Sequence, residues 1–459
     1  MPRKYSINSK KVYTHYINRK HSGFTLIEIV VAIGVLGIFF ATTALLLQQI
    51  LEGIARSRIR TTAMSIAQEK MELARNLPYT DVGTVGGIPQ GNIEQNEEII
   101  INGLTFTITT TVTYIDDPYD GLAPVDIINS DYKRIHIAIS WGGTYPSLYP
   151  LTLSTNISPK GLETDLGEGG TLQIQVFDAT GIPIPNATVT VDNVAILPEI
   201  HAQYLTDTQG YIILPESPTC ITCYEINISK SGYSSDKTYS SAEVTNPLKP
   251  HATILDGQIT DVSFSIDRLS SISVRSYGSK NLGYPTITNV TFTLKGSKII
   301  GYDTSDNPVY KFSYTTNTGG GSVGIPNLEW DAYSLEVTSH DFAGSNPYIP
   351  FNISPNSATT IPIVTLPKTN ASLLVIVTDP VSEPLASASV QLKNTVLAYD
   401  VSEYTASTGT ADFGQTFFNS LTPETYDIRV DLPGFETATA SVEISGHKQQ
   451  YFKLNTYVP

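Results

Sequence analysis

Cysteine is almost absent from this sequence, which has two in 459 residues. Disulfide bonds therefore do not build the fold. Charged residues are also scarce, at 15% of the chain, and acidic side chains outnumber basic ones to give a formal net charge of −15. Because proteins that bind nucleic acid contact phosphates through clustered Lys and Arg, this charge balance argues against nucleic acid as a partner.

Motifs for catalysis are missing or misplaced. There is no His-Glu-x-x-His motif and no phosphate-binding loop, and the histidines are scattered. Gly320-Gly-Ser322-Val-Gly324 matches the G-x-S-x-G string of hydrolases. That string marks a nucleophile only between a strand and a helix, whereas here it lies in a glycine-rich turn of a β-patterned region. The sequence therefore predicts a protein that is not an enzyme and carries no cofactor.

Proline is absent between Phe24 and Pro78, and this stretch opens with one long apolar run. No side chain from Ile29 to Leu51 is charged, and a helix of this length spans a hydrocarbon core of about 30 Å. The side chains before the run are basic (Arg3, Lys4, Lys10, Lys11, Arg19, Lys20), which predicts a cytoplasmic N-terminus. A secretory signal peptide is the alternative, but helical patterning continues past Leu51, where a small-residue cleavage site would otherwise follow.

Glu28 is the one acidic residue at the start of this run. A carboxylate inside a spanning helix costs on the order of 2–3 kcal/mol and therefore needs a partner. The sequence offers none nearby in the same helix, so we expect the partner to come from another chain.

Gly23-Phe24-Thr-Leu-Ile-Glu28 resembles the class III prepilin signal of type IV pilins and type II secretion pseudopilins. The resemblance implies that a prepilin peptidase cuts between Gly23 and Phe24 and methylates the new N-terminus at Phe24. It also implies that Glu28 pairs with the terminal amine of a neighbouring subunit during assembly. The chain departs from the family in its long leader, 1–23, and in lacking a proline midway along the apolar half of the helix.

Beyond Leu51 the pattern becomes amphipathic and predicts one helix over 24–77, about 80 Å long. Its expected packing positions recur at three- and four-residue steps, at Ile59, Ala63, Ile66, Lys70, Leu73 and Leu77, with Ala67, Met71 and Ala74 on adjoining rows. Three β signals follow, at 98–113, 132–141 and 148–157. They predict a small antiparallel sheet in a head domain, 78–158, that resembles the heads of minor pilins and type II pseudopilins.

The remainder of the chain repeats itself at a period of roughly 100 residues. Tyr224 opens a phrase Tyr-x-Ile-x-Ile followed by Gly-aromatic, which recurs at Tyr426 and, in weaker form, at Tyr333. Each phrase follows a threonine and a turn glycine, at Thr206/Gly210, Thr315/Gly319 and Thr405/Gly409. Each unit opens with an alternating strand, whose expected core residues are Leu172/Ile174/Val176, Ile272/Val274 and Leu374/Ile376.

A period this long fits tandem β-sandwiches better than a solenoid. The shared phrase resembles carboxypeptidase regulatory-like (transthyretin-like) sandwiches and, more loosely, Cna-B-like modules. After a linker at 159–170, the predicted sandwiches occupy 171–268, 269–367 and 368–459. We expect the strand-leading tyrosines to pack with one edge in water and the turn glycines to supply positive φ.

Two small clusters have alternative interpretations. Cys220 and Cys223, expected in the loop before Tyr224, predict a local disulfide, with a reduced pair as the alternative; metal binding is disfavoured because no second Cys pair or His pair accompanies them. Asp116, Asp117 and Asp120 form either an acidic turn or a Ca²⁺ site, since closely spaced carboxylates suit that ion.

The predicted fold class is an α+β pilin, with a long N-terminal helix and a small antiparallel sheet, followed by three all-β Ig/transthyretin-like sandwiches. The predicted function is that of a minor or tip subunit of a type IV pilus-like filament that displays adhesion or binding modules. A type II secretion pseudopilin is one alternative, and a membrane-anchored surface binding protein outside any filament is another. The implied partners are prepilin peptidase, other pilin subunits, the inner-membrane assembly machinery and a surface ligand of unstated identity. The precursor is expected in the cytoplasmic membrane and the mature protein in an extracellular filament or at the cell surface.

Overall fold

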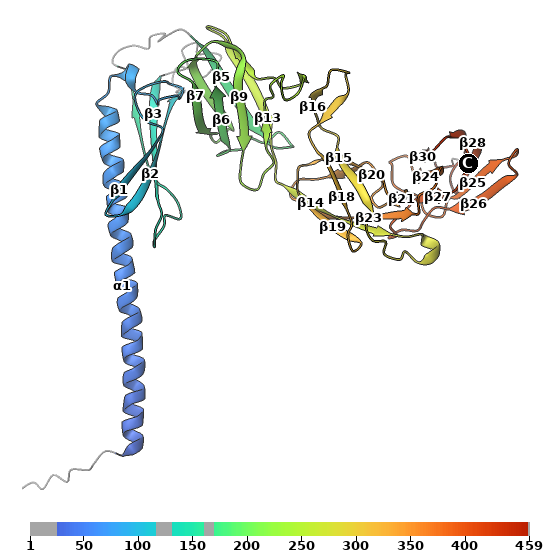
Figure 1. Cartoon of the computed structure of the whole chain (residues 1–459), viewed down its shortest axis with the longest axis horizontal. Coiled ribbons are helices and arrows are strands. Elements are labelled where there is room, and N and C mark those ends of the chain that lie inside the picture. Colours follow the sequence, from blue (N-terminus) through green and yellow to red (C-terminus); the bar gives the residue numbers. More distant parts are fainter. Residues whose placement is uncertain (1–24, 116–130, 160–168, 458–459) are drawn as a thin grey trace, which may run out of the picture.

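The computed structural model describes residues 25–115, 131–159 and 169–457. One long helix, α1, stands beside a small sheet, and three β units follow in a row that leads away from the helix (Figure 1). This architecture is the predicted one: an N-terminal helix with a small sheet, then β-sandwiches. The boundaries set for the individual domains remain predictions.

Helix α1 extends from Leu26 to Arg75 as 50 continuous residues. Its second half packs against the head and buries Ala63, Ile66, Ala67, Met71 and Ala74. The observed packing face is slightly rotated from the expected one. Leu73 was expected to pack against the head, but it is 57% exposed. The helix follows its 3.6-residue period, and the small Ala residues on the adjoining row let the sheet approach closely. Lys70, expected on the packing face, forms an ion pair with Glu97 of the sheet.

The head sheet is antiparallel with strand order β1-β2-β3-β4. Its strands are β1 (Asn96–Ile101), β2 (Leu104–Ile115), β3 (Tyr132–Trp141) and β4 (Leu151–Ile157), after a short 3₁₀ turn, η1 (Tyr79–Asp81). The single β signal predicted at 98–113 is in fact a hairpin. Asn102 and Gly103 both have positive φ, 52° and 76°, which is the geometry of a two-residue hairpin turn.

Each of the three later units packs two sheets around one apolar core. In the first unit the sheets are β13-β5-β8 and β10-β9-β6-β7, with β12 beside β9. The strands are β5 (Gly170–Phe177), β6 (Thr188–Asn193), β7 (Ile200–Leu205), β8 (Tyr211–Ser217), β9 (Cys220–Ser229), β10 (Asp236–Lys237), β12 (Ala252–Ile254) and β13 (Ile259–Ser265).

The second and third units repeat this plan. The second has sheets β19-β14-β23-β21 and β18-β15-β20-β22, and the third has β27-β24-β30 and β26-β25-β28-β29. Strands of the second are β14 (Ser270–Tyr277), β15 (Thr291–Gly296), β18 (Ser313–Asn317), β19 (Ser322–Leu328), β20 (Asp331–Val337), β21 (Asp341–Ser345), β22 (Phe351–Ile353) and β23 (Ala358–Leu366), with a 3₁₀ turn η2 (Lys280–Leu282). Strands of the third are β24 (Ser372–Thr378), β25 (Ser389–Asn394), β26 (Tyr399–Tyr404), β27 (Gln415–Phe418), β28 (Glu424–Asp431), β29 (Ala438–Ile444) and β30 (His447–Lys453).

The opening strand of each unit occupies the same place in its sheet. It pairs in parallel with the last strand of its unit and antiparallel with a middle strand: β5 with β13 and β8, β14 with β23 and β19, β24 with β30 and β27. The first and last strands of each unit therefore lie side by side. This shared topology is the structural counterpart of the sequence repeat.

The three repeated tyrosines are buried, contrary to the expectation that one edge would be wet. Tyr224, Tyr333 and Tyr426 are exposed by 1% or less. Each hydroxyl donates a hydrogen bond to a backbone carbonyl a few residues upstream: Pro218 at 2.6 Å, Glu329 at 2.9 Å and Thr422 at 3.0 Å. A buried tyrosine needs such a partner because an unpaired hydroxyl is costly away from water.

The repeated threonines pin a loop to the core. The hydroxyl of Thr405 accepts the Ala388 N–H at 2.9 Å and donates to the Leu385 carbonyl at 2.6 Å. Thr206 does the same in the first unit, with the Ala187 N–H and the Ile184 carbonyl. In the second unit this position is Thr318, not Thr315 as the sequence spacing suggested, because its hydroxyl accepts the Val290 N–H at 3.1 Å.

Strand β24 differs from the prediction in its core-facing residues. Leu374 and Ile376 were expected to face the core, but Leu373, Val375 and Val377 do so. Every residue of β24 is buried, because strand β21 of the preceding unit packs near its other face. A strand that is buried on both faces has no alternation from which its inner face can be read.

The units are joined by specific contacts. Ile88, from the loop after α1, enters the core of the first sandwich, where its N–H and carbonyl both bond to the hydroxyl of Tyr204 at 2.9 Å. The next joint is a small sheet in which β11 (Asn246–Pro247) pairs with β16 (Ile299–Tyr302), followed by β17 (Pro308–Tyr310). At the last joint, the Gln415 side chain bonds to both the N–H and the carbonyl of Ser345.

Replacing Thr405 with valine keeps the shape of the side chain but removes both hydrogen bonds. We expect the Ala388 amide to exchange with solvent deuterium about tenfold faster or more, since leaving buried backbone groups unpaired costs roughly 1–3 kcal/mol. Hydrogen exchange with mass spectrometry on the full chain measures this. Thr439→Val, on the exposed face of the same unit, is the control. Unchanged exchange at Ala388 would show that the loop is held by other contacts.

Gln415→Ala removes both bonds to Ser345 and should loosen the last joint. Spin labels at Leu282→Cys and Val396→Cys, which are 77% and 88% exposed at their native residues, report the distance between the second and third units. We expect a broader distance distribution in the Gln415→Ala variant than in the parent protein. Gln391→Ala, on an outward-facing strand of the third unit, is the control and should leave the distribution unchanged. Equal distributions in all three proteins would mean that the other contacts of this joint, such as the Tyr284–Asp412 and Asn346–Thr410 hydrogen bonds, fix it without Gln415.

Candidate functional site

Several predicted site residues lie outside the described residues. These are Gly23 and Phe24 of the processing site and Asp116, Asp117 and Asp120 of the acidic cluster. Cleavage, methylation and Ca²⁺ binding at these positions therefore stay predictions. Among the residues that the structure describes, no group of three His, Cys, Asp or Glu side chains could hold a metal ion.

Glu28 has a local partner that the sequence reasoning missed. Thr25 is the N-cap of α1 and Glu28 is the third helical residue, so the two form a capping box. The Glu28 N–H donates to the Thr25 hydroxyl at 3.3 Å, while the Glu28 carboxylate accepts the Thr25 N–H at 3.5 Å. The spacing Thr-x-x-Glu could have shown this signal. Glu28 therefore does not depend on another chain for every hydrogen bond, although the box leaves its charge without a cation.

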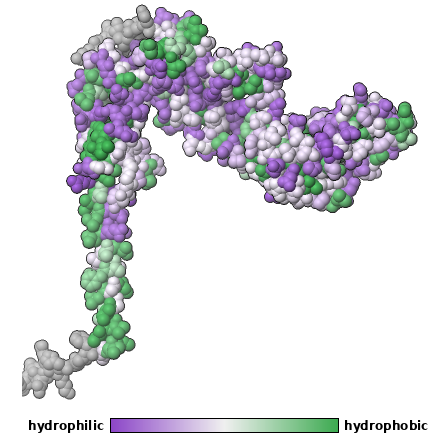
Figure 2. All heavy atoms as spheres, viewed as in Figure 1, coloured by the Kyte–Doolittle hydropathy of each residue, from purple (hydrophilic) through white to green (hydrophobic). Residues whose placement is uncertain are grey.

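The first half of α1 exposes a continuous series of large apolar side chains. None of its membrane-length window is buried, and α1 is the one described helix that is long and apolar enough to cross a bilayer. In Figure 2 this half is almost wholly hydrophobic in colour, whereas the head above it is mixed. Beyond the apolar half, α1 carries three arginines, Arg56, Arg58 and Arg60, which mark where its polar half begins. Such a surface has to be covered by lipid or by other helices.

The cysteines lie at the start of strand β9, not in the loop before it. Cys220 and Cys223 are joined by a disulfide, and both pack at the edge of the first sandwich core. The Asn193 side chain donates to the Cys223 sulfur at 3.3 Å. The disulfide joins residues only three apart, so it constrains one short segment. The rest of the sandwich is stabilised by its apolar core.

The G-x-S-x-G string is not a nucleophile elbow. Ser322 is the first residue of strand β19 and pairs in register with Arg275 of β14. Its hydroxyl lies 3.4 Å from the hydroxyl of Ser273. The elbow needs a sharp turn from a strand into a helix, and here the chain continues as a strand.

A buried polar cluster that the sequence did not indicate lies where the head meets the first sandwich. The Lys133 amine donates to the Tyr79 carbonyl at 3.0 Å and lies over the rings of Tyr79 and Tyr114, at 4.6 and 5.2 Å from their centroids. The Tyr114 hydroxyl donates to the Glu216 carboxylate of the sandwich. Burial lowers the pKa of Lys133, and burial, with the charge of Glu216, raises the pKa of Tyr79 to about 12. The cluster ties the two units together at neutral pH.

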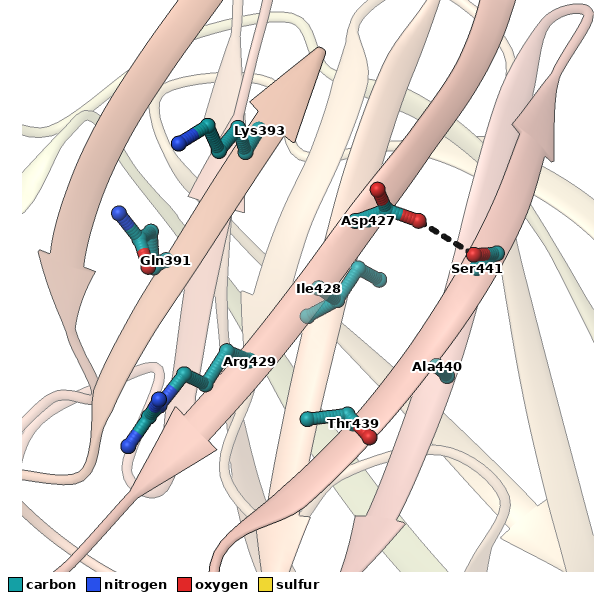
Figure 3. Close-up of a pocket in the computed structure, with 8 residues that line it drawn as sticks. All are labelled: Gln391, Lys393, Asp427, Ile428, Arg429, Thr439, Ala440 and Ser441. Atoms are coloured by element: carbon teal, nitrogen blue, oxygen red, sulfur yellow. Dashed lines mark hydrogen bonds between the residues drawn. The ribbon is translucent and has the colours of Figure 1, made fainter. Parts of the chain in front are cut away.

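The outer face of the third sandwich carries a shallow depression of about 310 Å³ (Figure 3). Several of its polar side chains already have partners, either within the depression or beside it. Asp427 accepts a hydrogen bond from Ser441, and Arg429 pairs with Asp431 at 2.6 Å. The lining residues come from strands β25, β28 and β29 and are Gln391, Lys393, Asp427, Ile428, Arg429, Thr439, Ala440 and Ser441. The arrangement is a mainly polar surface on the outer face of one sheet.

Comparison with known proteins identifies the N-terminal segment. Residues 18–44 match the family model described as a prokaryotic N-terminal methylation motif. This stretch contains the predicted cleavage site and opens into α1. No curated protein matches the sequence.

Similarities among solved structures are weak. The Bacillus anthracis TIE protein is 13% identical with a TM-score of 0.19, covering 79% of this chain and 72% of its own. The shaft pilin SpaA from Lactobacillus rhamnosus GG is 13% identical with a TM-score of 0.16, covering 42% and 99%. GBS52, the minor pilin of Streptococcus agalactiae, is 10% identical with a TM-score of 0.17, covering 41% and 97%. At such TM-scores these likenesses carry no argument, and what the comparisons establish is the N-terminal methylation motif at residues 18–44.

Proposed function

We propose that the chain is a pilin-like structural subunit that prepilin peptidase cuts between Gly23 and Phe24. The observation that carries this proposal is the continuity of the methylation motif with α1. The motif opens directly into a helix whose first half is fully exposed and apolar and whose second half packs on a small sheet. The first half suits lipid in the precursor and neighbouring helices in a filament. The precursor is then a membrane-anchored protein that becomes exposed at the surface.

The three sandwiches support a minor or tip position. They lead away from α1 as an arm (Figure 1), and specific hydrogen bonds join each unit to the next. In a helical filament with this arm on every subunit, the arms would crowd one another. The sandwiches then serve as display or adhesion modules of the carboxypeptidase regulatory-like type. Partners are other pilin subunits, the inner-membrane assembly machinery and a surface ligand at the exposed sandwich faces.

Two other functions fit the same helix. A type II secretion pseudopilin would use the same processing and assembly. A membrane-anchored surface protein would keep its leader and never enter a filament. Sensitivity to the peptidase separates the anchored protein from the two assembled ones.

Processing should be visible as a change in mass. In membranes that contain prepilin peptidase, the mature chain should begin at N-methylated Phe24, and in membranes that lack the enzyme it should retain residues 1–23. N-terminal sequencing and intact mass measure this directly. Gly23→Leu should keep the leader in both membranes, because a bulky side chain at the cut site blocks the peptidase, whereas Ser22→Ala should be processed normally. A leader retained in the native protein would support the membrane-anchored alternative.

The charge of Glu28 can be separated from its capping role. Glu28→Gln keeps the capping box, since glutamine serves equally at the third helical position, but it cannot pair ionically with a neighbouring amine. We expect this variant to insert into the membrane and to be cut normally, yet to be largely lost from sheared surface filaments. Quantitative immunoblots of membrane and filament fractions measure this. Adding Gln48→Glu, which places a carboxylate elsewhere on the helix, should not restore incorporation of the Glu28→Gln variant. Thr25→Ala tests the cap alone. Native incorporation of Glu28→Gln would show that the charge is not needed for assembly.

A further inference from the structure

An uncharged loop lies at the end of the head that faces the apolar half of α1. It connects β3 to β4 over residues 142–150 and contains no Asp, Glu, Lys, Arg or His. In Figure 1 this connection lies at the lower end of the head, beside the helix. Leu148 is 85% exposed and the neighbouring Tyr149 is 84% exposed. Leu148 and Tyr149 therefore present adjacent apolar surface at this end of the head.

Several contacts fix the position of the loop beside the helix. The Trp141 indole donates to the Tyr145 carbonyl at 3.0 Å, and the Ser147 N–H donates to the Trp141 carbonyl at 2.9 Å. The Arg56 guanidinium of α1 stacks over the Tyr145 ring at 5.1 Å. The loop is therefore held at the level of Arg56, and the exposure of Leu148 and Tyr149 belongs to an ordered turn.

If α1 crosses a bilayer, its length places Arg56 at the bilayer surface. The uncharged run of the helix ends at Leu51, and five further residues of helix rise about 7 Å. The headgroup layer on each side of the hydrocarbon core is about 5–8 Å thick. Tyrosine is enriched in this layer, and arginine there keeps its charged group in water while its stem lies in lipid.

We propose that, in the membrane-anchored protein, loop 142–150 rests in the headgroup layer of the bilayer that α1 crosses, with Leu148 and Tyr149 inserted. This inference rests on the membrane insertion of α1 in the proposed function. Lipid fits the loop better than a protein partner for two reasons. The loop has no charge to set the register of a protein contact. In addition, α1 exposes the apolar side chains of Ile50 and Ile54 just before Arg56, the residue that contacts the loop.

The contact has a consequence for the orientation of the head. A single helix leaves the head free to rotate and tilt over the membrane. A second contact beside the helix fixes one face of the head, and with it the arm, relative to the membrane. Withdrawing α1 into a filament would lift the loop out of the lipid.

A fluorophore sensitive to its surroundings, placed at Leu148→Cys, tests the contact. The full chain carries Cys220→Ser and Cys223→Ser so that one thiol reacts, and it is reconstituted into phosphatidylethanolamine–phosphatidylglycerol vesicles with a headgroup nitroxide lipid. A second set keeps the native cysteine pair and is labelled without reductant. Val396→Cys, 88% exposed at its native residue, is the matched control in the third sandwich, and Val35→Cys reports on the span itself.

We expect the nitroxide to quench the label at Leu148→Cys about threefold more than the label at Val396→Cys, because interfacial residues lie within the headgroup layer. Equal quenching at these two sites, with Val35→Cys quenched by acyl-chain nitroxides, would overturn the inference and leave the span intact. An unquenched Val35→Cys would overturn membrane insertion itself. An emission shift at Leu148→Cys that grows with the protein-to-lipid ratio, without quenching, would overturn the inference by showing that a second copy covers the loop.

Discussion

The apolar first half of α1 has to be removed from water, and the arrangement of the rest of the chain follows from this constraint. None of that segment is buried by the chain's own residues. It can be covered only by lipid or by the helices of other chains. The head and the sandwiches must then lie on one side of it, because charged side chains, beginning with Glu52, follow the apolar segment.

The same helix changes its role at the point where its surface changes. Beyond Arg56 the small side chains Ala63, Ala67 and Ala74 allow the head sheet to approach closely. One continuous rod therefore links an apolar anchor to a folded head, without proline to interrupt it. At the start of α1, the Thr25–Glu28 capping box supplies hydrogen bonds from within the helix itself. The Glu28 carboxylate stays available at the tip of the helix for a cation from another chain.

The arm depends on a different kind of contact. Within each sandwich a buried tyrosine and a buried threonine bond to backbone groups, which fixes loops that apolar packing alone would leave free. Between units, side chains such as Tyr204 and Gln415 bond to the backbone of the preceding unit. Hydrogen bonds of this kind are directional, so they set the orientation of one unit against the next more narrowly than an apolar surface would.

Local pattern was enough to determine the helix, the number of repeated units and the positions of most strands. The uncharged run from Ile29 to Leu51, the repeated tyrosine phrase and the motif ending at Glu28 are features of neighbouring residues. Elementary geometry predicts from them a long apolar helix and tandem sandwiches. Sequence spacing failed where a residue's surroundings come from elsewhere in the chain. Leu374 and Ile376 were assigned to the wrong face because strand β21 of another unit covers β24, and Thr318 replaced Thr315 because the choice depends on which hydroxyl meets the Val290 N–H. The Lys133–Glu216 cluster and the joint at Ser345 are likewise products of tertiary structure, since their partners are far apart in sequence and only packing of whole units brings them within bonding distance.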